Sequence, residues 1–236
     1  MNSSLEWIML IFFSFLPPLI YTVWIRNTEK CNREKWVTIF ICFIWGASLA
    51  VIAAIIIEIL LQMELYVSIT DAATVNFLTV VVVAPVAEEF TKPLVLGLKT
   101  VRKELDELED GLIYGAVAGL GFSATENLFY GNRFLAEGIF VFLVLIAVRS
   151  FSSCLLHASA TALTGYGYGK AVMKHSSIIR VIPYFILAIL VHGFYNFTLT
   201  FEMPGLLTGV VFAFLFVAFA ISYVRGKIKK LDAQTC

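Results

Sequence analysis

AATVNFLTVVVVAPVAEEFTKPLVLGL, residues 72–98, decides the fold class, because it is apolar enough to cross a membrane yet carries charged side chains. These charges are Glu88, Glu89 and Lys92. A charge at bilayer depth costs at least about 2.5 to 3.5 kcal/mol on insertion scales. Three charges in one apolar stretch therefore need a compensating role, and for charges within a membrane that role is usually functional.

The composition places the whole chain in the same class. Of the 236 residues, 60% are hydrophobic and only 14% are charged, and the mean hydropathy is +0.89. Apolar runs of roughly 20 residues, the length that spans a bilayer, recur along the chain. We expect an all-α polytopic membrane protein, a bundle of about seven transmembrane helices that forms a single integral membrane domain over residues 1–236. The expected spans lie near residues 5–25, 36–61, 73–98, 111–131, 138–165, 179–201 and 205–224.

The basic residues predict the orientation of this bundle. Fourteen of the 17 Lys and Arg side chains fall in alternate connecting segments, within residues 26–35, 99–103, 170–180 and 225–230. The opposite side carries only Arg133. Because Lys and Arg stay on the cytoplasmic side, we expect the N-terminus outside and the C-terminus in the cytoplasm. The zero formal net charge hides this asymmetry. The asymmetry favours the lipid bilayer as a partner, with the basic tail against anionic lipid. The zero net charge gives no reason to expect nucleic-acid binding.

Helical spacing brings the three charges together. Lys92 follows Glu88 by four residues and Glu89 by three, so its ammonium group can reach either carboxylate on one face. Pro85 and Pro93 each leave a carbonyl of the preceding turn without its helical donor. A helix loosened on both sides of two acids is tolerated in a membrane only against protein or a water-filled cavity. The simpler alternative is an ion-pair cluster that holds helices together.

Further polar side chains lie in the expected spans that follow. They are Phe122 and Glu126 in the fourth, Arg149 and His157 in the fifth, and His192 and Asn196 in the sixth. Phe122 and Glu126 are four residues apart, as are His192 and Asn196, so each pair shares a helix face. Taken singly, Glu126 could extend its carboxylate to the outer membrane–water interface, and each histidine could be a packing residue. Gly111, Gly115 and Gly119 predict close helix packing, within one chain or between chains.

The expected depths of these residues argue against one compact site. At 1.5 Å per residue, Glu88 and His192 fall near the middle of the membrane, Glu126 towards the outside and His157 towards the cytoplasm. The separation would shrink if the fifth helix were strongly tilted or extended beyond the surface. Its length of about 28 residues, against the roughly 20 that span a bilayer, allows either.

The set Glu88-Glu89-x-x-Lys92, Phe122-x-x-x-Glu126, His157 and His192-x-x-x-Asn196 resembles the PrsW family of intramembrane proteases. Four separated motifs agree with that family in order and spacing, and EDGLIYGAVAGLGFSATENLFYG, residues 109–131, is similar to its second motif region. The resemblance covers about residues 72–200 and places the catalytic-motif helices within 72–201. The related type II CAAX prenyl proteases typically have an arginine in place of the lysine and a histidine in place of Glu126.

The resemblance implies hydrolysis of a peptide bond in a membrane-anchored protein substrate, such as an anti-sigma factor, in a prokaryotic plasma membrane. Amide hydrolysis needs an activated water, a donor for the oxyanion and an acid for the leaving amine. We expect Glu88 to be the general base, with Glu89 tuning its proton affinity. His192 and Asn196 would orient water or stabilise the oxyanion, and His157 would be the remaining donor. The catalytic candidates are Glu88, Glu89, Glu126, His157, His192 and Asn196, supported by Lys92, Phe122 and Arg149.

Three alternatives stay open on the sequence alone. The family is classed with metalloproteases by analogy, and zinc could bind His157 and His192 with Glu126 or Glu88. The chain has no HExxH motif and the ligands would come from separate helices, so the sequence favours a metal-independent glutamate mechanism. An ion- or proton-coupled transporter also places acids near the midplane, but usually with internal repeats, which the chain lacks. The adjacent glutamates argue against an inert membrane scaffold.

Overall fold

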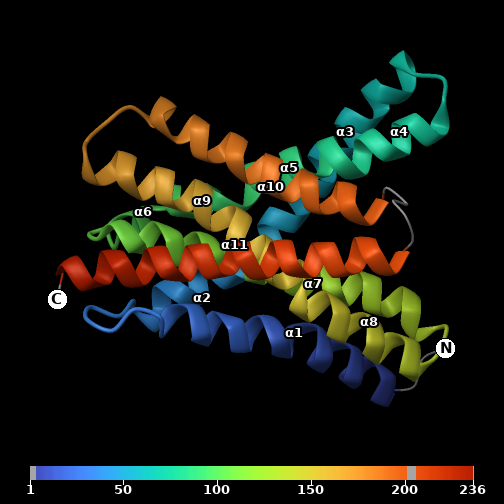
Figure 1. The fold of residues 1–236 in the computed structure, drawn as a ribbon, viewed down its shortest axis with the longest axis horizontal. Helices are drawn as coiled ribbons and strands as arrows, with labels where there is room; N and C mark the ends of the chain where they lie inside the picture. The colour runs from blue at the N-terminus through green and yellow to red at the C-terminus, as the bar shows by residue number, and fades with distance from the viewer. Residues whose placement is uncertain (1–3, 201–205, 236) are drawn as a thin grey trace.

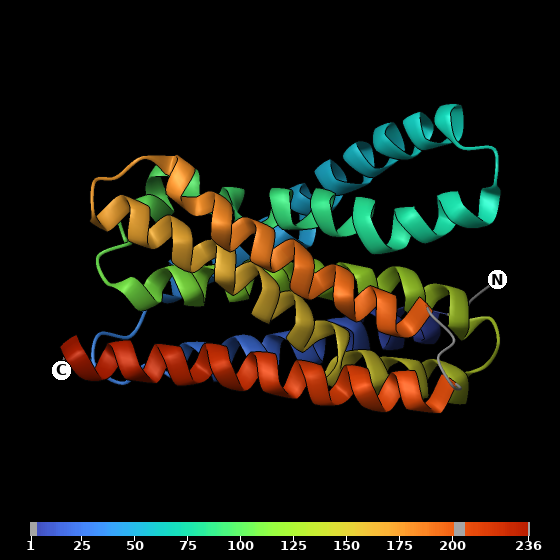
Figure 2. The same cartoon turned by 45° about the horizontal axis from the view of Figure 1, so that its top comes forward.

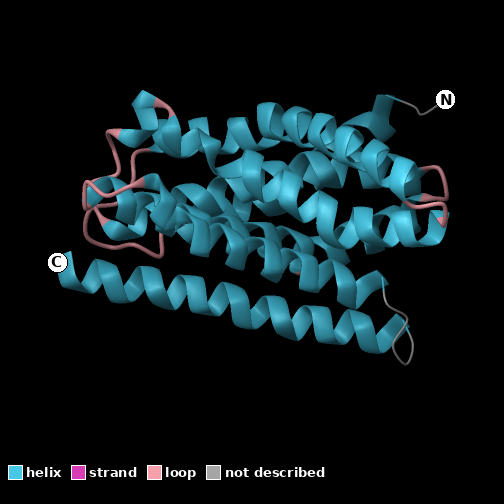
Figure 3. Cartoon of the chain, turned by 90° about the horizontal axis from the view of Figure 1, so that it is seen from above, coloured by secondary structure: helices cyan, strands magenta, loops and turns pink. Residues whose placement is uncertain are grey.

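The computed structural model describes residues 4–200 and 206–235, and every regular element in these ranges is helical (Figure 1). The helices run along the long axis of the molecule (Figure 3). The all-α class predicted from the sequence is therefore confirmed. In chain order the elements are α1 (Ser4–Arg26), α2 (Trp36–Trp45), η1 (Gly46–Ala50), α3 (Val51–Ser68), α4 (Ala72–Leu78), η2 (Thr79–Val83), α5 (Ala84–Thr91), η3 (Lys92–Gly97), α6 (Lys99–Arg102), α7 (Leu108–Leu135), α8 (Ile139–Phe151), α9 (Ser153–Met173), η4 (Ile178–Val181), α10 (Ile182–Thr200) and α11 (Leu206–Thr235).

Six helical stretches among the described residues are long and apolar enough to cross a membrane. They are Ser4–Arg26, Trp36–Ser68, Ala72–Gly97, Ile139–Met173, Ile178–Thr200 and Thr208–Gln234. Each overlaps one of the seven expected spans, although residues 201 and 205, at the ends of two of those, lie outside the described residues. The remaining span, 111–131, is part of α7, a helix of 28 residues that is not among the six apolar stretches.

Helix α7 differs from the apolar six because it lies in the middle of the bundle, against α1, α2 and α9 (Figure 2). Its residues from 109 to 124 are all buried. Small side chains allow this close packing: a Cβ atom added at Gly115 would lie 2.6 Å from the carbonyl oxygen of Thr161, and one at Gly119 would overlap the carbonyl group of His157. Gly111, Gly115 and Gly119 therefore pack against α9 of the same chain, which is one of the two roles that their spacing allowed.

The periphery of the bundle is apolar. Large hydrophobic side chains are exposed along the outer helices, including Phe40, Val67, Phe140, Leu215 and Phe219. A surface so rich in apolar side chains would favour aggregation in water, and lipid tails solvate it instead. The hairpin of α3 and α4 stands away from the other helices and adds to this surface (Figures 1 and 2).

Three departures from regular α-helix position the site. The π-helical η2 precedes Pro85, and the 3-10 helix η3 begins at Lys92 next to Pro93. The loosened helix expected on both sides of the glutamates is confirmed. The third departure is a break between α8 and α9, where Ser152 has φ −120° and ψ −76°. The fifth expected span is therefore two helices that meet at an angle.

Candidate active site

Glu88 and Glu89 lie on α5, the short helix between the two irregular segments, and both side chains are buried. Successive residues of an α-helix point about 100° apart, so the two carboxylates meet different neighbours. Between them lies Lys92, whose Nζ atom is 2.7 Å from Oε1 of Glu89 and 3.0 Å from Oε2 of Glu88. The lysine side chain is fully buried. One cation thus neutralises part of the charge of two adjacent acids.

Glu89 has a partner for both of its oxygens. Oε1 accepts a hydrogen bond from Lys92 and lies 2.9 Å from Nδ1 of His192. Oε2 accepts a hydrogen bond of 2.9 Å from the hydroxyl group of Thr161 on α9. Because Glu89 is the acceptor, Nδ1 of His192 carries the proton and Nε2 keeps its lone pair. Glu89 therefore joins α5, α9 and α10 at the middle of the bundle.

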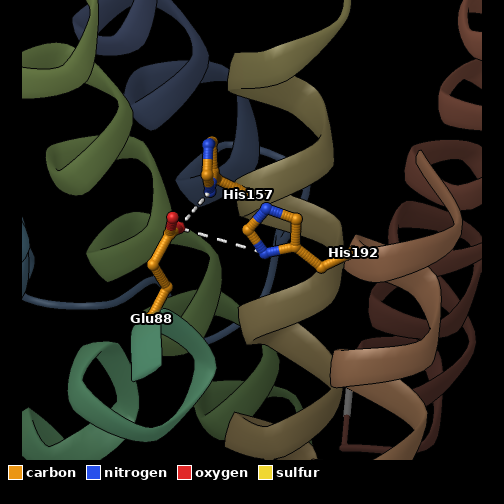
Figure 4. A group of neighbouring side chains, drawn as sticks. All are labelled: Glu88, His157 and His192. Atoms are coloured by element: carbon orange, nitrogen blue, oxygen red, sulfur yellow. Dashed lines mark ion pairs between the residues drawn. The ribbon is translucent and has the colours of Figure 1, made fainter. Parts of the chain in front are cut away.

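Glu88 differs from its neighbour, because its Oε2 atom is buried and accepts no hydrogen bond among the described residues. Lys92 lies 3.0 Å from this oxygen, but in a geometry that makes an ion pair without a hydrogen bond. Oε2 also faces both histidines, at 3.6 Å from Nδ1 of His157 and 3.9 Å from Nδ1 of His192 (Figure 4). A free acceptor among three polar side chains can receive a hydrogen bond from a small polar molecule.

His157 connects this centre to a second ion pair. Its Nε2 atom lies 2.7 Å from Oε2 of Glu126, and Arg149 donates to the same oxygen at 3.0 Å. Its Nδ1 atom lies 3.0 Å from Nζ of Lys92. Neutral His157 therefore carries its proton on Nε2 and accepts from the lysine at Nδ1. A continuous path of contacts therefore runs from Arg149 through Glu126, His157 and Lys92 to Glu89. Along it cations alternate with carboxylates, and the neutral imidazole lies between Glu126 and Lys92.

The wide separation in depth expected between Glu126 and His157 was wrong. The two side chains meet because α9 packs against α7 along the glycine stripe, with the backbone of His157 against Gly119. The fifth helical stretch also continues to Met173, beyond its expected end at residue 165, so His157 lies near its middle. The structure thus brings together Glu88, Glu89, Lys92, Glu126, Arg149, His157 and His192.

Phe122 supports the lysine and the histidine. The Nζ atom of Lys92 lies 4.6 Å from the centre of the Phe122 ring, and this ring is 5.6 Å from the ring of His157. An aromatic face stabilises a buried cation. The ring also covers the cluster on the side of α7, so it limits the access of water there.

Asn196 does not join the cluster, although it lies one turn after His192 on α10. Its Nδ2 atom donates a hydrogen bond of 2.8 Å to the carbonyl oxygen of Val80 in η2. The π-helical segment makes this carbonyl available, and Asn196 fastens α10 to it. In this structure the amide group therefore holds the irregular helix rather than the centre of the site.

Two contributing residues were missed by the sequence reasoning. Thr161 stood out only as part of a polar stripe, yet it holds Glu89. Glu58 of α3 is half-buried and repels Glu88 and Glu126 electrostatically. The signal for Glu58 was present, because it is an acid within the apolar run of α3 and the criterion that selected Glu88 applies to it equally.

Zinc has a candidate donor set here, but the hydrogen bonds oppose it. The ligand atoms of Glu88, His157 and His192 lie within 4.8 Å of one another, and two histidines with one carboxylate suit zinc in type. However, His157 Nδ1 accepts from the ammonium group of Lys92, and His192 Nδ1 donates to Glu89. With these partners neither Nδ1 atom offers a lone pair, so a metal ion bound through them would require Lys92 to leave His157 and His192 to lose the proton that it shares with Glu89.

Acids, histidines and a lysine that converge between apolar helices define a polytopic membrane protein with a buried polar site. The family model described as PrsW family intramembrane metalloprotease matches residues 34–223, so the chain belongs to this family. "Protease PrsW" of Clostridioides difficile (strain 630) is 28% identical over 193 residues, 80% of this chain and 78% of that protein. "Protease PrsW" of Oceanobacillus iheyensis (strain DSM 14371) is 31% identical over 187 residues, 78% of this chain and 79% of that protein. No solved structure matches.

These comparisons confirm the resemblance that the motifs indicated. The protein is an intramembrane protease and a multi-pass prokaryotic membrane protein. The transporter and the inert scaffold, which the sequence had left open, are the less favoured alternatives.

Proposed function

We propose that the protease hydrolyses a peptide bond of a membrane-anchored protein substrate with water that Glu88 activates. The observation that carries this proposal is the buried Oε2 atom of Glu88, which accepts no hydrogen bond and faces two histidines. Glu89, by contrast, has both oxygens engaged. Of two adjacent acids, Glu88 is the one that can take a proton from water, and Glu89 is the one that holds the site together.

The steps follow from these positions. A water molecule donates to Oε2 of Glu88, and Nε2 of His192 orients it because Glu89 fixes the ring through Nδ1. Glu88 takes a proton as the water oxygen bonds to the scissile carbonyl carbon, and the carbonyl electron pair moves to its oxygen. When the carbon–nitrogen bond breaks, the protonated Glu88 delivers its proton to the leaving nitrogen. General acid–base catalysis of this kind contributes typically about 10² to 10⁴ in rate.

Lys92 stabilises the oxyanion through its charge. In the resting site its ammonium group is balanced by Glu88 and Glu89, at 3.0 Å and 2.7 Å. When Glu88 takes the proton it becomes neutral, and the negative charge appears on the substrate oxygen instead. The net charge of the site stays constant, and a preorganised cation beside the new charge favours the transition state.

The substrate approaches the site through an apolar cavity between η3, α9, η4 and α10, which Glu89 lines and Glu88, its neighbour in the chain, does not. The cavity has a volume of about 360 Å³, and its lining includes Leu94, Gly97, Ile182 and Phe185 besides Glu89. An apolar lining fits the side chains of a membrane-spanning peptide. Gly97→Phe places a ring in this cavity, where an added Cβ atom meets nothing closer than 3.8 Å. We expect it to abolish cleavage in a reconstituted assay, while Gly226→Phe, where nothing lies within 4 Å, keeps full activity.

The topology belongs to the same proposal: seven crossings, with α7 as the buried one, the N-terminus outside and the C-terminus in the cytoplasm. Helix α1 begins and α11 ends at opposite ends of the bundle (Figure 1), as an odd number of crossings requires. The basic connecting segments lie together at the end where α11 stops (Figure 1). A green fluorescent protein fused to the C-terminus should fluoresce in bacteria, and an alkaline phosphatase fused there should stay inactive.

The central test compares substitutions of the two glutamates. Purified protein is reconstituted in liposomes with single-pass peptides, and the products are identified by mass spectrometry. Glu88→Gln should lower the cleavage rate by about 10² to 10⁴ and leave the unfolding temperature nearly unchanged. Glu89→Gln should lower both the cleavage rate and the unfolding temperature, because Lys92, His192 and Thr161 lose their charged partner.

Glu64→Gln, an exposed position on α3, is the control that should change neither quantity. Cleavage products that persist at the wild-type rate in Glu88→Gln would remove Glu88 from the mechanism. Proton flux into the liposomes without any cleavage by the wild-type protein would favour a transporter.

A further inference from the structure

A second group of acids lies away from the active site, at the end of the bundle that carries the basic segments. Glu29 lies in the segment between α1 and α2, Glu109 in the first turn of α7, and Asp232 near the end of α11. Their exposed fractions are 0%, 1% and 4%. One carboxylate oxygen from each lies within 4.8 Å of the other two. Glu29 also belongs to a second such trio, with Glu107 and Asp110.

Glu29 supplies an independent sign that this cluster takes a ligand. Its Oε1 atom is buried and has no hydrogen-bond partner among the described residues, while Oε2 accepts a hydrogen bond of 3.1 Å from the backbone N–H of Glu34. A buried carboxylate oxygen without a partner is costly. It lies where two trios of acids meet, so a ligand at this oxygen would contact several carboxylates.

Basic side chains at this end of the bundle are directed elsewhere. Arg33 donates to the backbone carbonyl of Glu29 rather than to its carboxylate. Lys35 pairs with Glu104 at 2.6 Å. Arg225 donates to Thr28 and stacks over a tryptophan ring. These contacts leave the negative charge of Glu29 without a counter-charge from these three side chains.

We propose that Glu29, Glu109 and Asp232 bind one hard divalent cation, magnesium or calcium. The cluster offers only carboxylate oxygens, and oxygen ligands suit these ions. Calcium–oxygen bonds are about 2.3 to 2.6 Å long, so oxygens that share one ion lie within about 5 Å of one another, as one oxygen from each of these acids does.

The three ligands come from parts of the chain that are far apart in sequence. Backbone N–H groups of Lys30 and Cys31 already donate to the carboxylate of Asp232, at 3.0 to 3.2 Å. A cation between the three carboxylates would fasten α11 and the α1–α2 segment to the start of α7. Its effect is on the stability of the bundle, because ligands that bind only the folded state raise its apparent stability.

Titration of the purified full chain with each cation tests the proposal. The protein is freed of metal with a chelator, and the unfolding temperature and calorimetric binding are followed with magnesium chloride and with calcium chloride up to about 10 mM, above the weakest affinities usual for protein calcium sites. We expect one ion per chain and a rise in the unfolding temperature. The ion that binds more tightly is the one that the geometry of the site favours.

Glu29→Gln keeps the shape of the side chain and removes one ligand charge. It should weaken binding at least about tenfold and, without metal, unfold at no lower temperature than the wild-type protein, because like charges are separated. Glu104→Gln, an acid at the same end that pairs with Lys35, should respond to the cation as the wild type does. The proposal is overturned if neither ion binds, or if Glu29→Gln binds as tightly as the wild type. The unfolding temperature and the calorimetric binding are both measured without peptide cleavage.

Discussion

The active site and the acidic cluster at the end of the bundle handle buried carboxylates in different ways. In the active site Glu88, Glu89 and Glu126 alternate with Lys92 and Arg149, so each acid has a cation within 3.0 Å. At the end of the bundle, backbone N–H groups donate to the carboxylates of Glu29, Asp110 and Asp232. Fixed cations from the chain are required at membrane depth, where an uncompensated charge is very costly. Near water, an exchangeable ion can supply the same charge.

The largest effect is expected from removing the cation that joins the active-site acids. Lys92→Met keeps most of the side-chain volume but leaves Glu88 and Glu89 without a counter-charge. Breaking a buried pair in this way costs about 3 to 5 kcal/mol. We expect a large fall in the unfolding temperature in detergent and no detectable cleavage. Lys92→Met with wild-type stability would show that the two acids are neutral in the folded protein.

A smaller effect, confined to one region, is expected from removing metal. Chelation should lower the unfolding temperature, because the cluster of Glu29, Glu109 and Asp232 loses its ion, yet leave the cleavage rate unchanged well below that temperature. Elemental analysis of the purified protein should find no stoichiometric zinc. Stoichiometric zinc whose removal abolishes cleavage, and whose return restores it, would replace the glutamate mechanism and would require Lys92 to move from His157.

The sequence contained the class of the protein and most of the residues that meet in the candidate active site, because charges inside apolar runs are conspicuous and helical spacing relates near neighbours. Glu88, Glu89 and Lys92 contact each other as their spacing predicted. The contact between Glu126 and His157 was not predicted, because the expected fifth span ended at residue 165, whereas the helical stretch continues to Met173 and His157 lies near its middle.

Other features depend on tertiary packing and leave no local signal. The hydrogen bond from Asn196 to Val80 joins residues that are 116 positions apart. The acidic cluster likewise joins Glu29 to Asp232, and each of these acids lies in a polar segment where a charge is unremarkable. Depth estimated from spans depends on where each span ends, and the estimate failed where the fifth helical stretch continues to Met173.

Gly119 fixes the distance between α7 and α9 at the candidate active site. A Cβ atom there would overlap the carbonyl group of His157, so the backbones of α7 and α9 touch at the residue that carries the imidazole. The missing methyl group sets how far the imidazole stands from Glu126, which lies seven residues, about two turns, further along α7. A glycine with no side chain can thus determine how far a neighbouring imidazole reaches, so the width of the α7–α9 interface controls the geometry of the candidate site.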